Sequence, residues 1–161
     1  MLKIIIFMLL VTFELLAQTV NFSERKYVET LDVYMYRDGN VTYEKEKTIV
    51  AYDDGKTIVK NEHNVTVYND ENEVLTVINL LERPEIGLHF SLTKALFQKD
   101  FERLKENFEM KQIGEKKFEF IPKGDIEKFV DKLELFLGKE DVVSVLKLKF
   151  SNGDKIKIEA K

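Results

Sequence analysis

Cysteine is absent from this chain of 161 residues, which also contains only two histidines and two prolines. Without cysteine there is no disulfide and no lipidated thiol to tether the protein to a membrane. Only His63 and His89 are available as histidine bases, and they lack the clustered spacing of metal ligands. No serine after the N-terminal segment has the Gly-x-Ser-x-Gly setting of a nucleophile; these serines are Ser23, Ser91, Ser144 and Ser151. We therefore expect neither an enzyme nor a bound cofactor or metal.

A strong excess of positive charge is also absent. The chain has 25 Lys and Arg against 29 Asp and Glu, a net charge of −4. This mild acidity argues against nucleic acid as a partner. Most carboxylates fall in turns or on polar strand faces, where we interpret them as solvated surface rather than as a hydrolytic pair.

No apolar run is long enough to span a bilayer. The longest follows Lys3 and extends from Ile4 to Phe13, where Glu14 interrupts it. At about 1.5 Å per residue this is shorter than the hydrocarbon layer of about 30 Å. A short apolar core after a positive charge, followed by small Ala17, is typical of a secretory signal peptide. We predict cleavage after Ala17, one domain over 18–161 and location in the periplasm, with secretion into the medium as the alternative.

Short segments rich in Val, Ile, Thr, Tyr and Phe alternate with turn clusters, which predicts hairpins linked in series. Arg37–Asn40 and Asp53–Gly55 are the expected tips, because Asp-Gly readily adopts the positive φ angles of tight hairpins. The strands predicted around these and later turns are Tyr27–Tyr36, Val41–Glu46, Thr48–Tyr52, Lys56–Lys60, Val65–Tyr68, Val74–Ile78 and Phe108–Ile113.

The last third of the chain alternates apolar and polar residues with period two. In Glu127–Leu137 the side chains of Phe129, Leu133 and Leu135 share one face, and Lys155–Ala160 alternates in the same way. Such alternation is typical of an antiparallel sheet with one wet and one covered face. With Val142–Phe150 between them, these segments predict a three-stranded meander.

One helix is expected in the centre, from Leu88 to about Leu104, where apolar residues recur at helical spacing after the break at Arg83–Gly87. A single helix covers only part of one sheet face, so the sheet must curl on itself. We predict a mainly β (α+β) fold, a strongly curved antiparallel sheet forming an incomplete barrel with the helix covering its open end. Such an apolar concavity suits an apolar ligand.

The order of these elements resembles the LolA family, the periplasmic carriers of outer-membrane lipoproteins. Phe118–Lys123, then strand Leu133–Leu137 and Asn152–Asp154, are similar to the family's "F-x-L-x-P-K … strand … D-G" ending. Upstream, Gly39–Tyr43 and Ile49–Gly55 are similar to its paired strands. The resemblance covers roughly residues 41–161. It implies an incomplete barrel whose hydrophobic interior holds acyl chains, loaded by an inner-membrane exporter and delivered to an outer-membrane acceptor.

Two features depart from the family pattern. Only Gln18–Ser23 precedes the first predicted strand, which leaves no room for the family's helix after the signal. Glu46-Lys47 stands where the family tends to place an Arg-Pro pair that helps to hold the lid. Both departures concern how the lid over the open end of the barrel opens and closes.

Lipid-binding residues are predicted on the strands and the helix: Val33, Met35, Tyr43, Leu92, Leu96, Phe97, Leu133 and Leu135. Ordinary core packing is the competing interpretation of the helix residues. The alternative function is a non-catalytic envelope scaffold or interaction domain with a filled core. We expect a monomer. Asn40 and Asn64 each begin an N-x-T string in an expected turn, which allows glycosylation.

Overall fold

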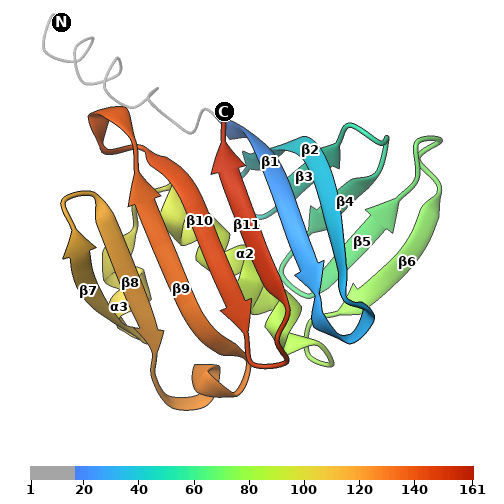
Figure 1. The fold of residues 1–161 in the computed structure, drawn as a ribbon. Coiled ribbons are helices and arrows are strands. Elements are labelled where there is room, and N and C mark those ends of the chain that lie inside the picture. The colour runs from blue at the N-terminus through green and yellow to red at the C-terminus, as the bar shows by residue number, and fades with distance from the viewer. Residues whose placement is uncertain (1–16) are drawn as a thin grey trace, which may run out of the picture.

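The computed structural model describes residues 17–161, which form one eleven-stranded antiparallel sheet with two helices on one face (Figure 1). The predicted signal peptide lies almost entirely outside these residues and stays a prediction. Within residues 17–161, no helix has the length and apolar character needed to cross a membrane.

The chain builds the sheet as two meanders that meet in the middle. The first comprises β1 (Gln18–Val28), β2 (Val33–Tyr43), β3 (Thr48–Tyr52), β4 (Thr57–Lys60), β5 (Asn64–Tyr68) and β6 (Val74–Asn79). The second comprises β7 (Phe108–Gly114), β8 (Lys117–Pro122), β9 (Val130–Leu137), β10 (Val143–Phe150) and β11 (Lys155–Ala160). Short 3₁₀ turns lie at Glu29–Leu31, Gly124–Lys128 and Lys139–Asp141.

Pairing of β1 with β11 joins the two meanders, giving the strand order β6-β5-β4-β3-β2-β1-β11-β10-β9-β8-β7. The helices α2 (Pro84–Phe97) and α3 (Phe101–Lys105) carry the chain from one outer strand, β6, to the other, β7. These two edge strands do not pair, so the sheet stays open. The predicted fold, an incomplete antiparallel barrel with a central helix, is confirmed.

Alternation along the strands selects the face that the helices cover. Leu133, Leu135, Leu146 and Leu148 are buried on the inner face, while the residues between them, Glu134 and Lys147, point to the opposite, outer face. The helices lie across this inner face behind the strands in Figure 1. The predicted C-terminal meander is confirmed, although β9 begins at Val130 because 124–128 form a 3₁₀ turn. Period-two alternation predicts that Val130 lies on the face opposite Phe129, Leu133 and Leu135, but this residue is fully buried next to a register shift.

The first predicted hairpin is wrong. Gln18–Val28 forms β1, and the tip lies at Glu29–Asp32, where Asp32 adopts a left-handed φ of 50°. Arg37–Asn40, expected as the tip, lies inside β2. Gly39 allows β2 and β3 to approach closely there, since a Cβ at this position would lie 2.4 Å from the Ala51 carbonyl oxygen. Asn40 is therefore a half-buried strand residue rather than a turn residue.

The single long helix is also wrong in its bounds, because two helices replace it. α2 begins earlier than expected, with Pro84 in its first turn, where a missing backbone N–H is tolerated. The chain breaks at Lys99, which has a φ of 57°. Asp100 then caps α3 by accepting a hydrogen bond from the backbone N–H of Arg103 (3.3 Å).

Candidate functional site

Helix α2 lies in the hollow of the sheet and divides the inner face into a packed half and a looser half. Leu92 and Leu96 of α2 belong to the same buried cluster as Leu133 and Leu135 of β9. Leu96 is 0% exposed. This half of the interior is an ordinary core.

The looser half lies between α2 and strands β1 to β4, where a partly open cavity of about 50 Å³ remains. Most of its walls are aromatic or aliphatic: Phe22, Val41, Tyr43, Val50, Tyr52, Ile58, Phe90, Phe97 and Ile158. The rings of Tyr43 and Phe97 lie 6.4 Å apart between centroids. A volume of this size holds no more than one or two waters, and ligand pockets are usually at least about 300 Å³. The resting interior is therefore nearly filled.

Two polar atoms in this apolar setting lack partners. The Tyr43 hydroxyl and His89 Nδ1 are shielded from solvent and make no hydrogen bond within the described residues. The nearest candidate is the Thr93 hydroxyl, which donates to the carbonyl of its own helix at His89 (3.0 Å) or Phe90 (3.1 Å) and whose oxygen is placed to accept no more than a weak interaction from Tyr43. Buried polar atoms without partners are uncommon, and each destabilises a fold by about 1–3 kcal/mol.

Two ionisable groups line the same cavity. Burial lowers the pKa of His89 to about 4, and the positive charge of Lys26 acts in the same direction. Burial raises the pKa of the Glu24 carboxyl, against the opposing effect of Arg37. Alternation along β1 places Phe22, Glu24 and Lys26 on the inner face. His89 is thus uncharged at neutral pH.

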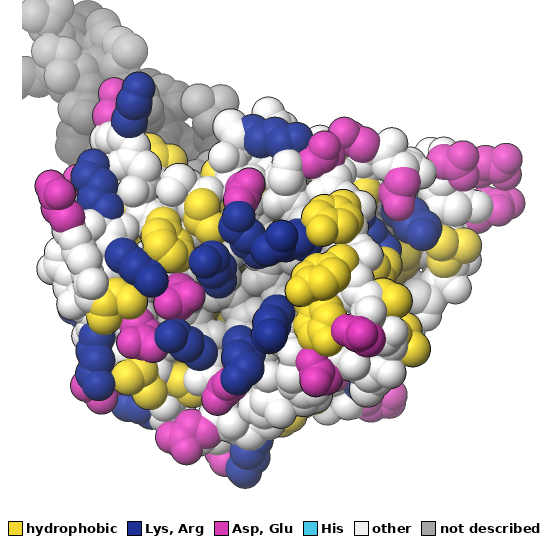
Figure 2. Space-filling model, in the orientation of Figure 1, with side chains coloured by type: hydrophobic (Ala, Val, Ile, Leu, Met, Phe, Trp, Pro, Cys, Tyr) yellow, Lys and Arg dark blue, Asp and Glu magenta, His cyan; other side chains and the backbone are white. Residues whose placement is uncertain are grey.

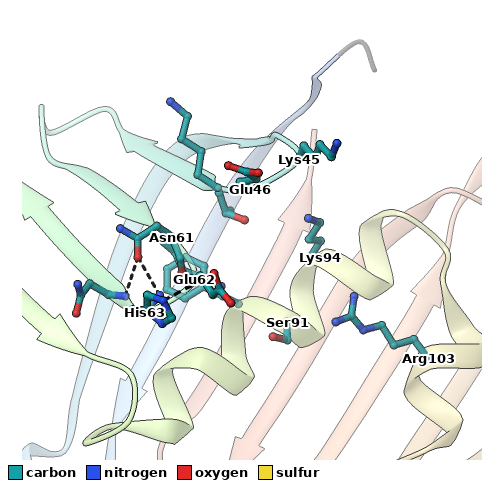
Figure 3. A pocket seen from close by; sticks show the side chains of 13 residues that line it. Lys45, Glu46, Asn61, Glu62, His63, Ser91, Lys94 and Arg103 are labelled. Atoms are coloured by element: carbon teal, nitrogen blue, oxygen red, sulfur yellow. Dashed lines mark hydrogen bonds and ion pairs between the residues drawn. The ribbon is translucent and has the colours of Figure 1, made fainter. Parts of the chain in front are cut away.

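A wider cleft of about 550 Å³ opens to solvent beside the cavity, and Phe90 contributes to both. Its walls come from the Lys45–Thr48 and Lys60–Asn64 segments and from the two helices. Figure 3 shows Lys94 of α2 and Arg103 of α3 facing the segment around Asn61. The Asn61 side chain fixes that segment by accepting hydrogen bonds from the backbone N–H groups of His63 (3.0 Å) and Asn64 (2.8 Å).

Positive charge predominates in the cleft. Lys60, Lys94 and Arg103 line it, and none of them has an ion-pair partner among residues 17–161. Partial burial lowers the pKa of Lys60, and the nearby charges of Lys94 and Arg103 add to that effect. Glu46 and Glu62 also line the cleft, but its five cations, which include Lys45 and Lys47, outnumber them, so the cleft keeps a net positive charge that favours an anionic group.

The predicted binding residues divide into three groups. Tyr43 and Phe97 line the cavity, whereas Leu92, Leu96, Leu133 and Leu135 are buried core residues. Val33 and Met35 are exposed on the β1–β2 hairpin. Contact of these residues with a lipid stays a prediction.

Several polar residues of the site were not predicted from the sequence. Glu24 was missed because β1 was not recognised, although its alternation with Phe22 was visible. His89 was left out of the predicted site because it lacks the clustered spacing of metal ligands. Lys94 and Arg103 lie on two helices separated by a break, so no sequence spacing indicated that they share a cleft.

No family model matches the chain, and no curated protein matches its sequence. Solved structures similar to the fold include a LolA superfamily protein from Nitrosomonas europaea, at 10% identity and a TM-score of 0.38, covering 90% of this chain and 84% of that chain. Lipoprotein LppX from Mycobacterium tuberculosis is similar at 14% identity and a TM-score of 0.45, covering 90% of this chain and 85% of that chain. A DUF1329 family protein from Desulfovibrio piger is similar at 11% identity and a TM-score of 0.46, covering 99% of this chain and 89% of that chain. Identities this low concern the fold alone.

Proposed function

We propose that the protein is a periplasmic carrier that binds the acyl chains of a lipoprotein, or of a related lipid, between α2 and the curved sheet. It accepts this cargo from an inner-membrane exporter and delivers it to an outer-membrane acceptor. No covalent step is involved. The observation that carries the proposal is the apolar cavity under α2, which contains unpaired polar atoms and adjoins a cationic cleft.

The apolar walls supply the driving force. Each methylene removed from water contributes about 0.8 kcal/mol, so a carrier must offer continuous apolar surface. The present 50 Å³ is too small for an acyl chain. Binding therefore requires α2 to move away from β1–β4, and the open edges of the sheet allow this without breaking a closed barrel.

The unpaired atoms indicate where the polar part of a guest would lie. A ligand carbonyl would accept a hydrogen bond from the Tyr43 hydroxyl, which has no partner in the resting fold. Forming that bond recovers the free energy lost by burying the hydroxyl alone. The cleft cations Lys60, Lys94 and Arg103 are placed to bind a negatively charged head group.

A fluorescence titration with cis-parinaric acid tests the proposal on protein purified as residues 18–161. The probe should bind and fluoresce. Ile58→Phe, which fills the cavity, should weaken binding about tenfold or more, because a bulky side chain then occupies the space of the guest. Val77→Phe is the matched control, since Val77 is exposed on β6. Thermal unfolding must show that both variants are folded.

A second comparison concerns the head group. Lys94→Gln combined with Arg103→Gln should weaken binding of the free acid at least about tenfold, since the loss of even one charge-assisted hydrogen bond removes about 1.5–3 kcal/mol. Binding of the methyl ester of the same probe should change little, because it has no charge. Equal effects on acid and ester would refute the role of these cations in the cleft.

The alternative is an envelope scaffold or interaction domain with a filled core, and the small cavity favours it. If wild-type protein binds no probe and carries no acyl material by mass spectrometry, this alternative replaces the carrier.

A further inference from the structure

The outer face of the sheet, opposite the helices, has a second hollow that the cavity under α2 does not explain. Its volume is about 270 Å³, and one carboxylate, Glu134, lies among six cations. Figure 2 shows Lys and Arg side chains around this hollow, with hydrophobic side chains at its border toward β1 and β2. The cations are Arg25, Lys132, Lys147, Lys149, Lys155 and Lys157.

Several of these cations are direct cross-strand neighbours. Lys147 pairs in register with Lys157, and Lys149 pairs with Lys155 on one side and Lys132 on the other. Like charges directly opposite each other destabilise a sheet. Because the chain as a whole is acidic, its charge balance does not require lysines to be concentrated here.

Ion pairs neutralise only part of this surface. Lys132, Lys149 and Lys157 have carboxylate partners, which are Glu119 with Glu134, Asp131 and Glu159. Within residues 17–161, Arg25, Lys147 and Lys155 have none.

These three unpaired cations lie over aromatic rings instead. Arg25 is 5.6 Å from the Tyr34 ring centroid, Lys155 is 5.3 Å from that of Tyr27, and Lys147 is 5.0 Å from that of Phe136. Stacking of this kind leaves the charges available to an outside anion.

The neighbouring β1–β2 hairpin adds exposed apolar side chains. Leu31 at its tip is 69% exposed, and Tyr34 and Tyr36 on β2 are exposed as well. Tyrosine is enriched at the level of lipid head groups, and cations beside an anionic leaflet are attracted to it. An acidic soluble partner would satisfy the cations but would not explain an exposed leucine at the tip.

We propose that this outer surface, formed by β1, β2 and β9–β11, docks on an anionic phospholipid membrane. The cations contact head-group phosphates, and Leu31 enters the interface. The cavity under α2 takes no part, so this surface and the carrier function succeed or fail separately.

Sedimentation with vesicles tests the charges. Full-length mature protein should bind vesicles of phosphatidylcholine with 30% phosphatidylglycerol far better than phosphatidylcholine alone. Lys147→Gln combined with Lys155→Gln should weaken binding about 25-fold, at about fivefold per cation. The matched control is Lys56→Gln with Lys139→Gln, two exposed lysines in turns elsewhere that produce the same change in net charge.

Fluorescence tests the insertion, because the chain has no tryptophan. A tryptophan at the tip, Leu31→Trp, should shift its emission to the blue when anionic vesicles are added. Leu81→Trp is the control, since Leu81 is 87% exposed in the loop after β6.

Three results would overturn the proposal. One is equal binding to neutral and anionic vesicles, and another is equal weakening by the two double variants. The third is binding to soluble polyglutamate that is as strong as binding to anionic vesicles, together with no blue shift in the emission of the Leu31→Trp variant. That result would indicate an acidic protein partner instead.

Discussion

Acid should weaken the fold through His89, and the size of the effect follows from its setting. The imidazole extends from α2 toward Lys26 of β1, and its pKa falls from 6.5 to about 4 because burial and the charge of Lys26 both disfavour the charged form. In the unfolded chain the same group takes up a proton near pH 6.5. The uncharged folded state is therefore favoured fully above pH 6.5, and this contribution is lost as pH falls toward 4.

The magnitude can be worked from that interval. At about 1.4 kcal/mol per pH unit, the span from 6.5 to about 4 corresponds to about 3 kcal/mol. Between pH 7 and pH 4.5 the wild-type protein should lose most of this contribution to its free energy of unfolding, in addition to the general effect of protonating carboxylates. His89→Gln keeps a polar side chain but does not titrate, so its free energy of unfolding should fall over the same interval by about 3 kcal/mol less than that of the wild type.

Urea unfolding of both proteins at half-unit pH steps measures the difference. An NMR titration of the imidazole signals reports the pKa of His89 directly, with exposed His63 as the other histidine signal. If the two proteins give parallel stability profiles, His89 is solvated in the folded state and the reasoning is wrong.

Other substitutions test the packing by thermal or urea unfolding. Gly39→Ala should destabilise by about 3 kcal/mol, because its Cβ would meet the Ala51 carbonyl oxygen, while Gly114→Ala, which meets only the Lys117 Cβ at 3.4 Å, should change little. Glu24→Gln should stabilise at pH 7 and lose that advantage in acid, since burial raises the pKa of Glu24. Leu96→Ala should lose about 2–5 kcal/mol from a fully buried site. A smaller loss would mean that α2 is loosely held.

Local patterns identified most strands correctly, and the reason is physical. Period-two alternation in β11, and in β9 after the register shift at Val130, reports which side chains avoid water, and this is the same in sequence and structure. Asp53–Gly55 formed the expected turn because Gly55 adopts a φ of 89°. The same Asp-Gly rule wrongly predicted a turn at Gly39, because a glycine is needed for a close approach of two strands as much as for a turn. Only the position of β3 shows which of these two roles the glycine has.

The sequence by itself determined the class of fold, the open curved sheet and the apolar character of the central helix, since all three follow from the order of polar and apolar residues along the chain. Only the tertiary structure decided which side chains meet. It paired β1 with β11, brought Lys60, Lys94 and Arg103 to one cleft, and placed Glu24 and His89 in the lining of one cavity. These contacts join residues far apart in the chain, and no local pattern encodes the register that brings them together.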